Sequence, residues 1–378
     1  MDYKKLFETE IRTDLIKKRR SEGKKVLGMV CCHVPFELLH AAGISPIRLR
    51  ATGKKDMGAA DPYFVPQSCD FAKTIYQNLC DGVYELDGLV SSDGCDVPVQ
   101  IASAWKRHLE GIGREEFIYD VSAPRVITDA SQGYFKYELE DLRDALEEFS
   151  GNKITDEKLK HSIELYNEAR RLVRQVYDLH LEDDPVITGE DTLKITLAAT
   201  ELPIEEYIEL LKAFLEDAKN FEPQGKGRVR VMLVGSSLDD PSFIKLIEDC
   251  GCLVVCDLNS FGIRFLGEPM DYDENDPLGS LAKHYLGRAS CPRMMDGSDR
   301  IHEYIIDTAA EFQVDGVIIE RLKHCEKWQN EAFVIGDLLK SNNIQYIEVE
   351  RQQPLVGPAQ IELRVEAFKE MLETLKES

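Results

Sequence analysis

The chain has 378 residues, of which 43% are hydrophobic and 30% charged, a composition typical of a globular protein with a sizeable core. Its 69 acidic and 46 basic residues give a net charge of −23, which argues against a nucleic-acid-binding protein because such proteins need a basic surface. No apolar run is long enough to cross a membrane, and the charged N-terminus lacks the apolar region of a signal peptide. We therefore expect a cytoplasmic protein of two or three domains, with neither a membrane nor a nucleic acid as partner.

The first part of the chain alternates between strand and helix patterns. A spaced set of apolar residues predicts a helix from Tyr3 to Arg20. Short apolar runs then predict four buried strands, which are Lys25–Cys31, Ile44–Leu49, Leu86–Ser91 and Phe117–Val121. Helical patterns between them predict helices at Glu37–Ala42, Phe71–Leu79 and Val97–Gly111. This alternation favours a parallel sheet with helices on its faces.

A helical stretch and a second strand–helix pattern follow. From Ser131 to about Ala218, helix formers with apolar residues every three or four positions indicate a connecting helical segment. Further strands are predicted at Arg228–Gly235, Cys252–Asp257, Asp315–Glu320 and Gln345–Val349. Helices are predicted from Pro241 to Gly251, at Glu331–Leu339 and at Gln360–Lys376. The predicted fold is α/β, with two Rossmann- or flavodoxin-like lobes of parallel sheet at residues 1–130 and 223–378 and a helical connecting segment at 131–222.

The ten cysteines are the most informative residues, because disulfide bonds are not expected in a long chain of cytosolic character. Each one is a buried small side chain, a metal ligand or a reactive thiol. Sites in parallel α/β sheets gather at the carboxyl ends of strands, and the cysteines that follow strand-like runs are Cys31, Cys32, Cys95 and Cys325. Cys69 precedes a predicted helix, whose first N–H groups favour a thiolate.

The other cysteines have simpler interpretations. Cys80 lies on the apolar side of a predicted helix, near its end, and we interpret it as core. Cys252 and Cys256, near Cys250, are four residues apart on a predicted strand, so we expect them to share its inward face. Cys291 lies in a predicted loop, and its sequence position fits either a packed side chain or a metal ligand. There is no C-x-x-C pair and no ferredoxin-type run, so the spacing alone identifies no cluster.

Several segments together carry a resemblance to a known family. In the N-terminal part they are Cys31–Leu49 (CCHVPFELLHAAGISPIRL), Pro66–Cys69 (PQSC) and Gly94–Asp96 (GCD). In the C-terminal part they are Val231–Gly251, Val314–Trp328 (VDGVIIERLKHCEKW) and the ending from Gly357 through Arg364–Phe368. In order and spacing these segments resemble the 2-hydroxyacyl-CoA dehydratase and benzoyl-CoA reductase family, and in particular its smaller (β, D-component-like) subunit. The chain departs from the family pattern at Ser-Cys-Asp around Cys69, where relatives often have Cys-Pro, and at the Cys31–Cys32 pair.

The resemblance implies one [4Fe-4S] cluster in the cleft between the lobes. Carried over position by position, its three ligands are Cys69, Cys95 and Cys325, with Cys291 as a competitor for the third place. Three protein ligands leave one iron with an open position.

The chemistry that the resemblance implies is the anaerobic dehydration of an (R)-2-hydroxyacyl-CoA to an enoyl-CoA. One electron reduces the thioester carbonyl to a ketyl radical. The radical expels hydroxide, and its β-proton then becomes acidic. After the product forms, the electron returns to the cluster. The resemblance also implies a separate ATP-hydrolysing iron–sulfur activator that supplies this electron. The chain has no G-x-x-x-x-G-K-[ST] loop, so we do not expect it to use ATP itself. A homologous larger subunit would complete a heterodimer.

Other functions remain open at this point. Within the family they are a subunit of an ATP-dependent benzoyl-CoA reductase and a homodimeric reductase with a bridged double cubane cluster. Outside it, two β/α lobes around a cleft also suit a cluster-free small-molecule-binding protein.

Charged residues near the expected site are weaker candidates. His33 and Glu37 could position substrate or transfer a proton, but we favour a surface or satisfied loop histidine and a carboxylate in the first turn of a helix. Basic residues that could attract CoA phosphates, or simply be solvated, are Arg48, Arg50, Lys54, Lys55, Arg264, Arg288, Arg293 and Arg300.

Overall fold

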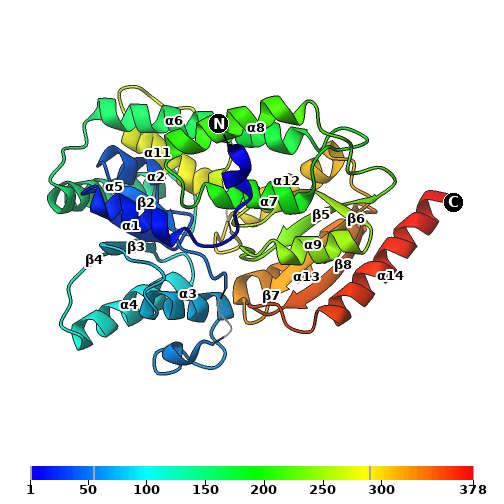
Figure 1. The fold of residues 1–378 in the computed structure, drawn as a ribbon, viewed down its shortest axis with the longest axis horizontal. Coiled ribbons are helices and arrows are strands. Elements are labelled where there is room, and N and C mark those ends of the chain that lie inside the picture. Colours follow the sequence, from blue (N-terminus) through cyan, green and yellow to red (C-terminus); the bar gives the residue numbers. More distant parts are fainter. Residues whose placement is uncertain (1, 54–55, 289–290, 378) are drawn as a thin grey trace.

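Two four-stranded parallel sheets frame the computed structural model, which describes residues 2–53, 56–288 and 291–377 (Figure 1). The first has the order β2-β1-β3-β4 and consists of β1 (Val26–Met29), β2 (Ser45–Arg48), β3 (Gly88–Ser92) and β4 (Phe117–Val121). The second has the order β6-β5-β7-β8 and consists of β5 (Val229–Gly235), β6 (Cys252–Leu258), β7 (Gly316–Leu322) and β8 (Gln345–Arg351). The predicted α/β fold with two Rossmann- or flavodoxin-like lobes is confirmed.

The two sheets share one topology, and this fixes where a site can form. In each sheet the second strand lies on one side of the first, and the third and fourth strands lie on the other side. The direction in which strands are added therefore reverses between β1 and β3 and between β5 and β7. Loops leaving such a pair of strands diverge to opposite faces of the sheet and leave a crevice at their carboxyl ends. The segments after β1, β3, β5 and β7 are therefore the places to look for function.

Helices of the first lobe follow the predicted alternation except at the N-terminus. They are α1 (Thr13–Ser21), α2 (Phe36–Ala41), α3 (Asp70–Cys80) and α4 (Asp96–Gly111). The single helix predicted from Tyr3 to Arg20 is wrong, because a 3₁₀ helix (Tyr3–Phe7) and α1 are separate. The break is held by Arg12, whose backbone N–H donates to the buried Glu201 carboxylate at 3.1 Å and whose guanidinium donates to the carbonyl of Lys5. This tertiary contact outweighs the helical pattern.

The central helices are α5 (Asp129–Ser150), α6 (Asp156–Asp178), α7 (Gly189–Ala198) and α8 (Ile204–Ala218), of which α6 and α8 lie along the top of the molecule in Figure 1. Threonine hydroxyls at positions 128, 155 and 188 accept N–H groups in the first turns of α5, α6 and α7, which explains where these helices begin. The domain boundaries at residues 130 and 222 stay a prediction.

The C-terminal half contains α9 (Ser242–Asp249), α10 (Ile263–Leu266), α11 (Pro277–Gly287), α12 (Ser298–Glu311), α13 (Glu326–Ser341) and α14 (Pro358–Glu377). The sequence patterns did not predict α10, α11 or α12. Of these, α11 crosses back and packs against α5 and α6. The lobes are thus joined by helices as well as by the chain connection.

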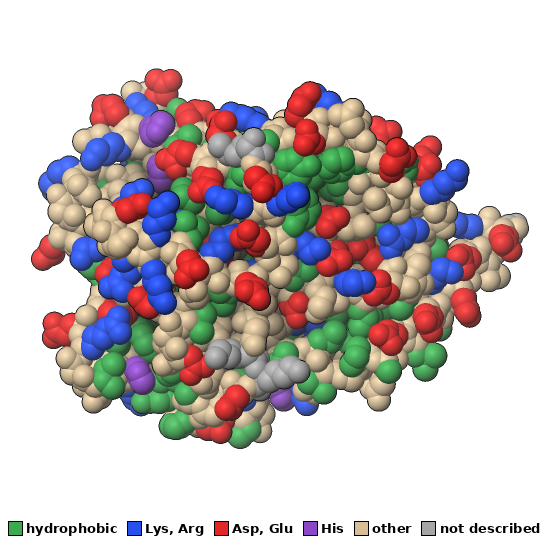
Figure 2. Space-filling view, viewed as in Figure 1, with side chains coloured by type: hydrophobic (Ala, Val, Ile, Leu, Met, Phe, Trp, Pro, Cys, Tyr) green, Lys and Arg blue, Asp and Glu red, His purple; other side chains and the backbone are tan. Residues whose placement is uncertain are grey.

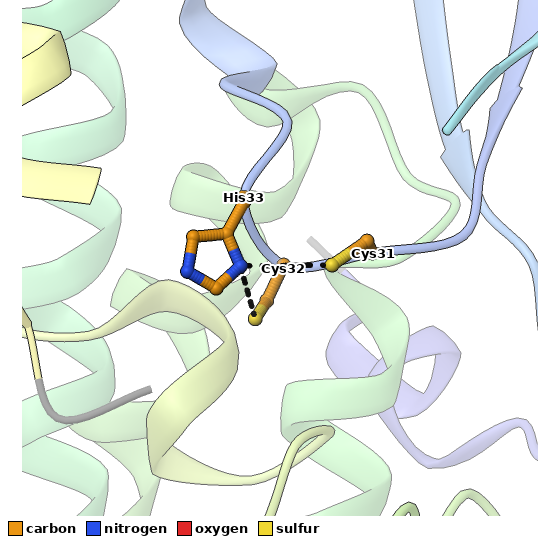
Figure 3. A group of neighbouring side chains, drawn as sticks. All are labelled: Cys31, Cys32 and His33. Carbon is orange, nitrogen blue, oxygen red and sulfur yellow. Dashed lines mark hydrogen bonds between the residues drawn. The ribbon is translucent and has the colours of Figure 1, made fainter. Parts of the chain in front are cut away.

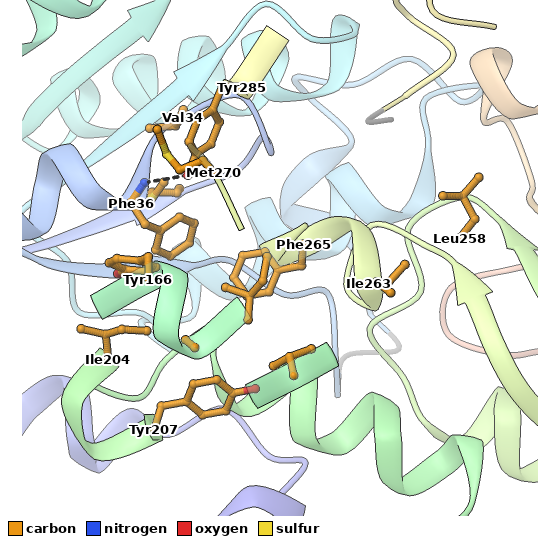
Figure 4. Packing of buried hydrophobic residues seen from close by; sticks show 14 of the residues in the cluster. Val34, Phe36, Tyr166, Ile204, Tyr207, Leu258, Ile263, Phe265, Met270 and Tyr285 are labelled. Carbon is orange, nitrogen blue, oxygen red and sulfur yellow. Dashed lines mark hydrogen bonds between the residues drawn. The ribbon is translucent and has the colours of Figure 1, made fainter. Parts of the chain in front are cut away.

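A shared core joins the first lobe to the helices that follow it (Figure 4). Phe36 of α2 packs edge-on against Phe265 of α10, with ring centroids 5.3 Å apart, and lies 6.0 Å from Tyr166 of α6. The hydroxyl of Tyr285 in α11 lies 3.4 Å from the backbone nitrogen of Phe36. Segments from all parts of the chain therefore hold α2, and the loop before it, in place.

A bulge in β6 separates the faces on which Cys252 and Cys256 lie, contrary to the prediction. Cys252 and Cys256 are both buried, as expected. However, the pairing of β5 with β6 skips Val255, so the two-residue alternation of the strand shifts there. Cys252 packs into one hydrophobic cluster and Cys256 into another, and the common inward face predicted for them is wrong.

Acidic and basic side chains are intermixed over the face seen in Figure 2. The negative net charge of the chain is therefore not gathered into one acidic patch on that face. In the described part of the chain, no helix combines the length and the apolarity that a membrane crossing requires.

His180 is expected to make folding sensitive to acid. Its ring is fully buried, Nε2 lies 2.8 Å from the hydroxyl of Thr192, and burial together with the charge of Arg230 lowers its pKa from 6.5 to about 3. Between these two values the unfolded chain binds more protons than the folded one, so stability falls as the pH falls. Acidification from pH 7 to pH 5 should lower the free energy of unfolding of the wild type by about 2 kcal/mol more than that of a His180→Gln variant. Urea unfolding of both proteins at the two pH values measures this difference. Equal pH dependence of the two proteins would show that His180 is readily protonated when folded.

Candidate metal centre

A cavity of about 300 Å³ opens between the carboxyl ends of the two sheets. Its walls come from the loops after β1, β3, β5 and β7 and from the segment before α3, so it occupies the crevice that the topology predicts. Six of the ten cysteines of the chain line this cavity, and they are Cys31, Cys32, Cys69, Cys95, Cys291 and Cys325. We call it the cysteine cavity.

Three of these cysteines occupy the same structural position. Cys69 is the N-cap residue of α3, Cys95 that of α4 and Cys325 that of α13. The first N–H groups of each helix have no partner within the helix, and the helix dipole adds positive potential at this end. Three helix N-termini therefore converge on the cysteine cavity, each carrying a sulfur where negative charge is favoured.

Burial acts against the ionisation of these thiols. It raises the pKa of Cys69 to about 11 and that of Cys95 to about 12, and it also raises the pKa of Cys325. Backbone N–H groups in the first turns of the three helices act in the opposite direction but do not overcome burial. In the metal-free chain these thiols are therefore protonated at neutral pH, and a metal that binds them must displace the protons.

A second group of possible ligands follows β1 directly (Figure 3). The Sγ atoms of Cys31 and Cys32 each lie 3.6 Å from Nδ1 of His33, and the ligand atoms of the three residues lie within 4.8 Å of one another. A hydrogen bond between the two thiols is the largest influence on both, and it raises the pKa of Cys31 and lowers that of Cys32. Soft thiolates with an imidazole form a typical donor set for zinc or iron. The sequence offered one signal for this group, the Cys-Cys-His run at the end of an apolar strand.

Gly94 and Cys291 bring the two groups of cysteines close together. A Cβ atom on Gly94 would lie only 2.7 Å from Sγ of Cys31, so the lack of a side chain lets Cys31 approach the turn that carries Cys95. Cys291 reaches the same cavity from the loop before Arg293, and burial raises its pKa. The six sulfurs thus belong to one site.

Buried arginines complete the wall of the cavity. Arg48, Arg264 and Arg293 all line it and are 3%, 5% and 4% exposed. Arg293 donates to the carbonyl of Ala123 at 2.6 Å, and Arg288, just outside the lining, donates to the carbonyl of Cys32. The cavity therefore combines thiols with positive charge, which suits a negatively charged occupant.

The remaining candidates lie elsewhere. The carboxylate of Glu37 is wholly buried, 2.5 Å from Nη2 of Arg170 and 2.7 Å from the hydroxyl of Tyr285. Burial alone would raise the pKa of Glu37, but Arg170 and Tyr285 outweigh it and hold that pKa below its usual range. Arg50 is buried against Glu201, so it is not free to bind phosphates. Arg288 and Arg300 lie at a second cavity of about 540 Å³, which Arg264 lines as well, and Lys54 and Lys55 lie outside the described residues.

The family of the chain is decided by comparison with known proteins. A family model described as 2-hydroxyglutaryl-CoA dehydratase, D-component, matches residues 31–372. The chain belongs to this family. The D-component family match covers every strand of the two sheets except β1, and all six cysteines of the cavity. The resemblance carried by the sequence segments is thereby confirmed.

Relatives in the D-component family are subunits of several enzymes. The chain is 28% identical to a benzoyl-CoA reductase subunit of Thauera aromatica, over 87% of this chain and 86% of that one. It is 24% identical to the (R)-phenyllactyl-CoA dehydratase beta subunit of Clostridium sporogenes, over 98% of both chains. It is 22% identical to the beta subunit of (R)-2-hydroxyglutaryl-CoA dehydratase of Acidaminococcus fermentans, over 95% of both. These relatives are named as subunits, so the family works in multi-subunit complexes.

Proposed function

We propose that the chain is the iron–sulfur subunit of an (R)-2-hydroxyacyl-CoA dehydratase, with a [4Fe-4S] cluster held by Cys69, Cys95 and Cys325. The observation that carries this proposal is the convergence of three helix N-termini on one cavity, each with a cysteine at its N-cap. An anionic cluster with thiolate ligands gains from the N–H groups and dipoles of all three helices. The buried arginines of the wall act in the same direction.

The cluster would supply one-electron chemistry that amino-acid side chains cannot, the reduction of a thioester carbonyl to a ketyl radical that then expels hydroxide. The chain itself contributes the ligands, the positive surroundings and a half-enclosed cavity. An ATP-hydrolysing iron–sulfur activator delivers the electron to this subunit, which relays it to a homologous larger subunit where the substrate binds. We place the protein in the cytoplasm.

A second candidate, a homodimeric reductase with a bridged double cubane cluster, is favoured by one specific observation. Cys31, Cys32 and Cys291 form another set of three thiols in the same cavity, beyond the three that one cubane requires. Gly94 keeps this set next to the turn of Cys95. Two cubanes side by side, with three ligands each, would use all six sulfurs. A benzoyl-CoA reductase subunit remains the alternative within the family, supported by the 28% identical relative.

Analysis of iron and acid-labile sulfide in the anaerobically purified protein tests these proposals. About four irons per chain are expected for one cubane and about eight for a double cluster. A protein without iron or sulfide, made in cells able to assemble clusters, would leave only a cluster-free binding protein. Assays of the complex with its activator against 2-hydroxyacyl-CoA and aromatic acyl-CoA then separate dehydratase from benzoyl-CoA reductase.

A further inference from the structure

Arg48 carries a fixed positive charge across the boundary between the lobes. It ends β2 in the first lobe, and its Nη1 donates to the carbonyl of Ser260, after β6, at 2.5 Å. Its guanidinium lies over the rings of Phe261 and Phe265, 4.1 and 4.7 Å from their centroids. A carbonyl and two aromatic faces thus hold this cation rigidly at the wall of the cysteine cavity.

No carboxylate in the described part of the chain pairs with the charge of Arg48. Among the described residues Arg48 forms no ion pair, and its buried Nε has no hydrogen-bond partner. Burial lowers its pKa to about 10, so it stays charged at neutral pH, and the acidic groups that act on it are the thiols of Cys32 and Cys31. A buried cation is unfavourable unless an anion compensates it. Because Arg48 lines the cavity, a negatively charged group bound there would compensate its charge.

Arg264 of α10 also lines the cysteine cavity and is likewise held by an aromatic ring and a backbone carbonyl. Its guanidinium lies 4.8 Å from the ring centroid of Trp328, and its Nη2 donates to the carbonyl of Gly235 at 2.9 Å. The groups that favour its charged form are the thiols of Cys291, Cys32 and Cys325 and the carboxylate of Asp257. Two arginines, one from each lobe, are thus held in place facing the sulfurs of one cavity.

We propose that Arg48 and Arg264 are fixed counter-charges that raise the reduction potential of the cluster in the cysteine cavity. The inference rests on the proposed function. When the activator passes one electron to this subunit, the cluster of the activator is oxidised by one electron and the cluster of this chain is reduced by one, with no bond formed or broken. The negative charge in the cavity rises by one unit. Positive charges already in place stabilise that state without any rearrangement, and surrounding charge is one of the quantities that set cluster potentials.

A redox titration of the anaerobically purified, cluster-containing protein, followed by electron paramagnetic resonance, tests the inference. Arg48→Met and Arg264→Met should each shift the midpoint potential to a more negative value at unchanged iron content. Arg48→Lys keeps the charge while losing the stacking, and it should stay close to the wild type. Arg300→Met is the matched control, because Arg300 lies at the second cavity, partly exposed and 3.9 Å from Asp296, and its loss should leave the potential unchanged.

The outcomes separate this inference from the proposed function. Wild-type potentials in Arg48→Met and Arg264→Met proteins with full iron content would overturn the inference alone, whereas a wild type without iron would overturn the proposed function. Loss of iron from Arg48→Met but not from Arg48→Lys would support the counter-charge. If neither Arg48 variant folds, the role of Arg48 is packing between the lobes, and the inference is overturned for that residue.

Discussion

Replacing Cys69, Cys95 or Cys325 with alanine is expected to remove most of the iron from the protein and to abolish turnover. Each of the three is the N-cap of its own helix at the wall of one cavity, so each variant loses one of the three proposed sulfur ligands. Two thiolates hold a cubane far less firmly than three, and a cluster that is lost takes the electron-transfer function with it. Iron and acid-labile sulfide per chain, measured after anaerobic purification, report the loss directly.

Cys80 provides the matched control for this experiment. It ends α3, the helix that Cys69 begins, and it packs at the edge of the hydrophobic core. Cys80→Ala should retain the iron content of the wild type. An equal loss of iron from this variant would contradict the assignment of Cys80 to the core and of the other three cysteines to the cluster. Full iron content in Cys325→Ala would indicate that Cys291, and not Cys325, is the third ligand of the cluster.

Glu37→Ala is expected to destabilise the folded protein by about 3–5 kcal/mol, because it leaves the guanidinium of Arg170 buried without its counter-ion. Both side chains are almost fully buried, and Arg170 is fixed by further bonds to the carbonyl of Leu266 and the side chain of Asn167. The pair therefore connects α2 and α6 to the end of α10. Denaturant unfolding of the wild type and the variant at neutral pH measures the difference.

A surface ion pair provides the contrast. Glu206 lies 2.8 Å from Nζ of Lys5, a side chain that is 54% exposed. Glu206→Ala should change stability by less than about 1 kcal/mol, since water already solvates both charges. A Glu37→Ala protein of wild-type stability that had lost its activity would contradict the structural role of Glu37 and restore the catalytic one.

Inner strands such as β5, and the buried β6, were predictable from the sequence because burial on both faces of a parallel sheet gives a continuous apolar run. All eight predicted runs became strands, and Phe117–Val121 has the predicted bounds. Contacts between distant segments were not predictable in this way. The N-terminal helix breaks because Glu201 binds Arg12, and β6 shifts its alternation at a bulge that only its pairing with β5 reveals.

The candidate site was predictable in part for a similar reason. Strand ends pointed to Cys95 and Cys325, and the start of a predicted helix pointed to Cys69. That all three lie at one cavity depends on how the two lobes face each other, which no local pattern encodes. The role of Arg48 was equally hidden, because its position in the sequence suits a solvated surface, while the structure buries it against Phe261 and Phe265.

The positions of the three N-cap cysteines also bear on how the molecule is assembled. Cys69 and Cys95 belong to the first lobe and Cys325 to the second, so a cluster bound to all three would act as a cross-link between chain segments far apart in the sequence. Such a link couples cluster binding to the folded arrangement and fixes the three segments relative to one another. Insertion of the cluster would then be a late event in maturation, because the ligand set is complete only after both lobes have folded and met.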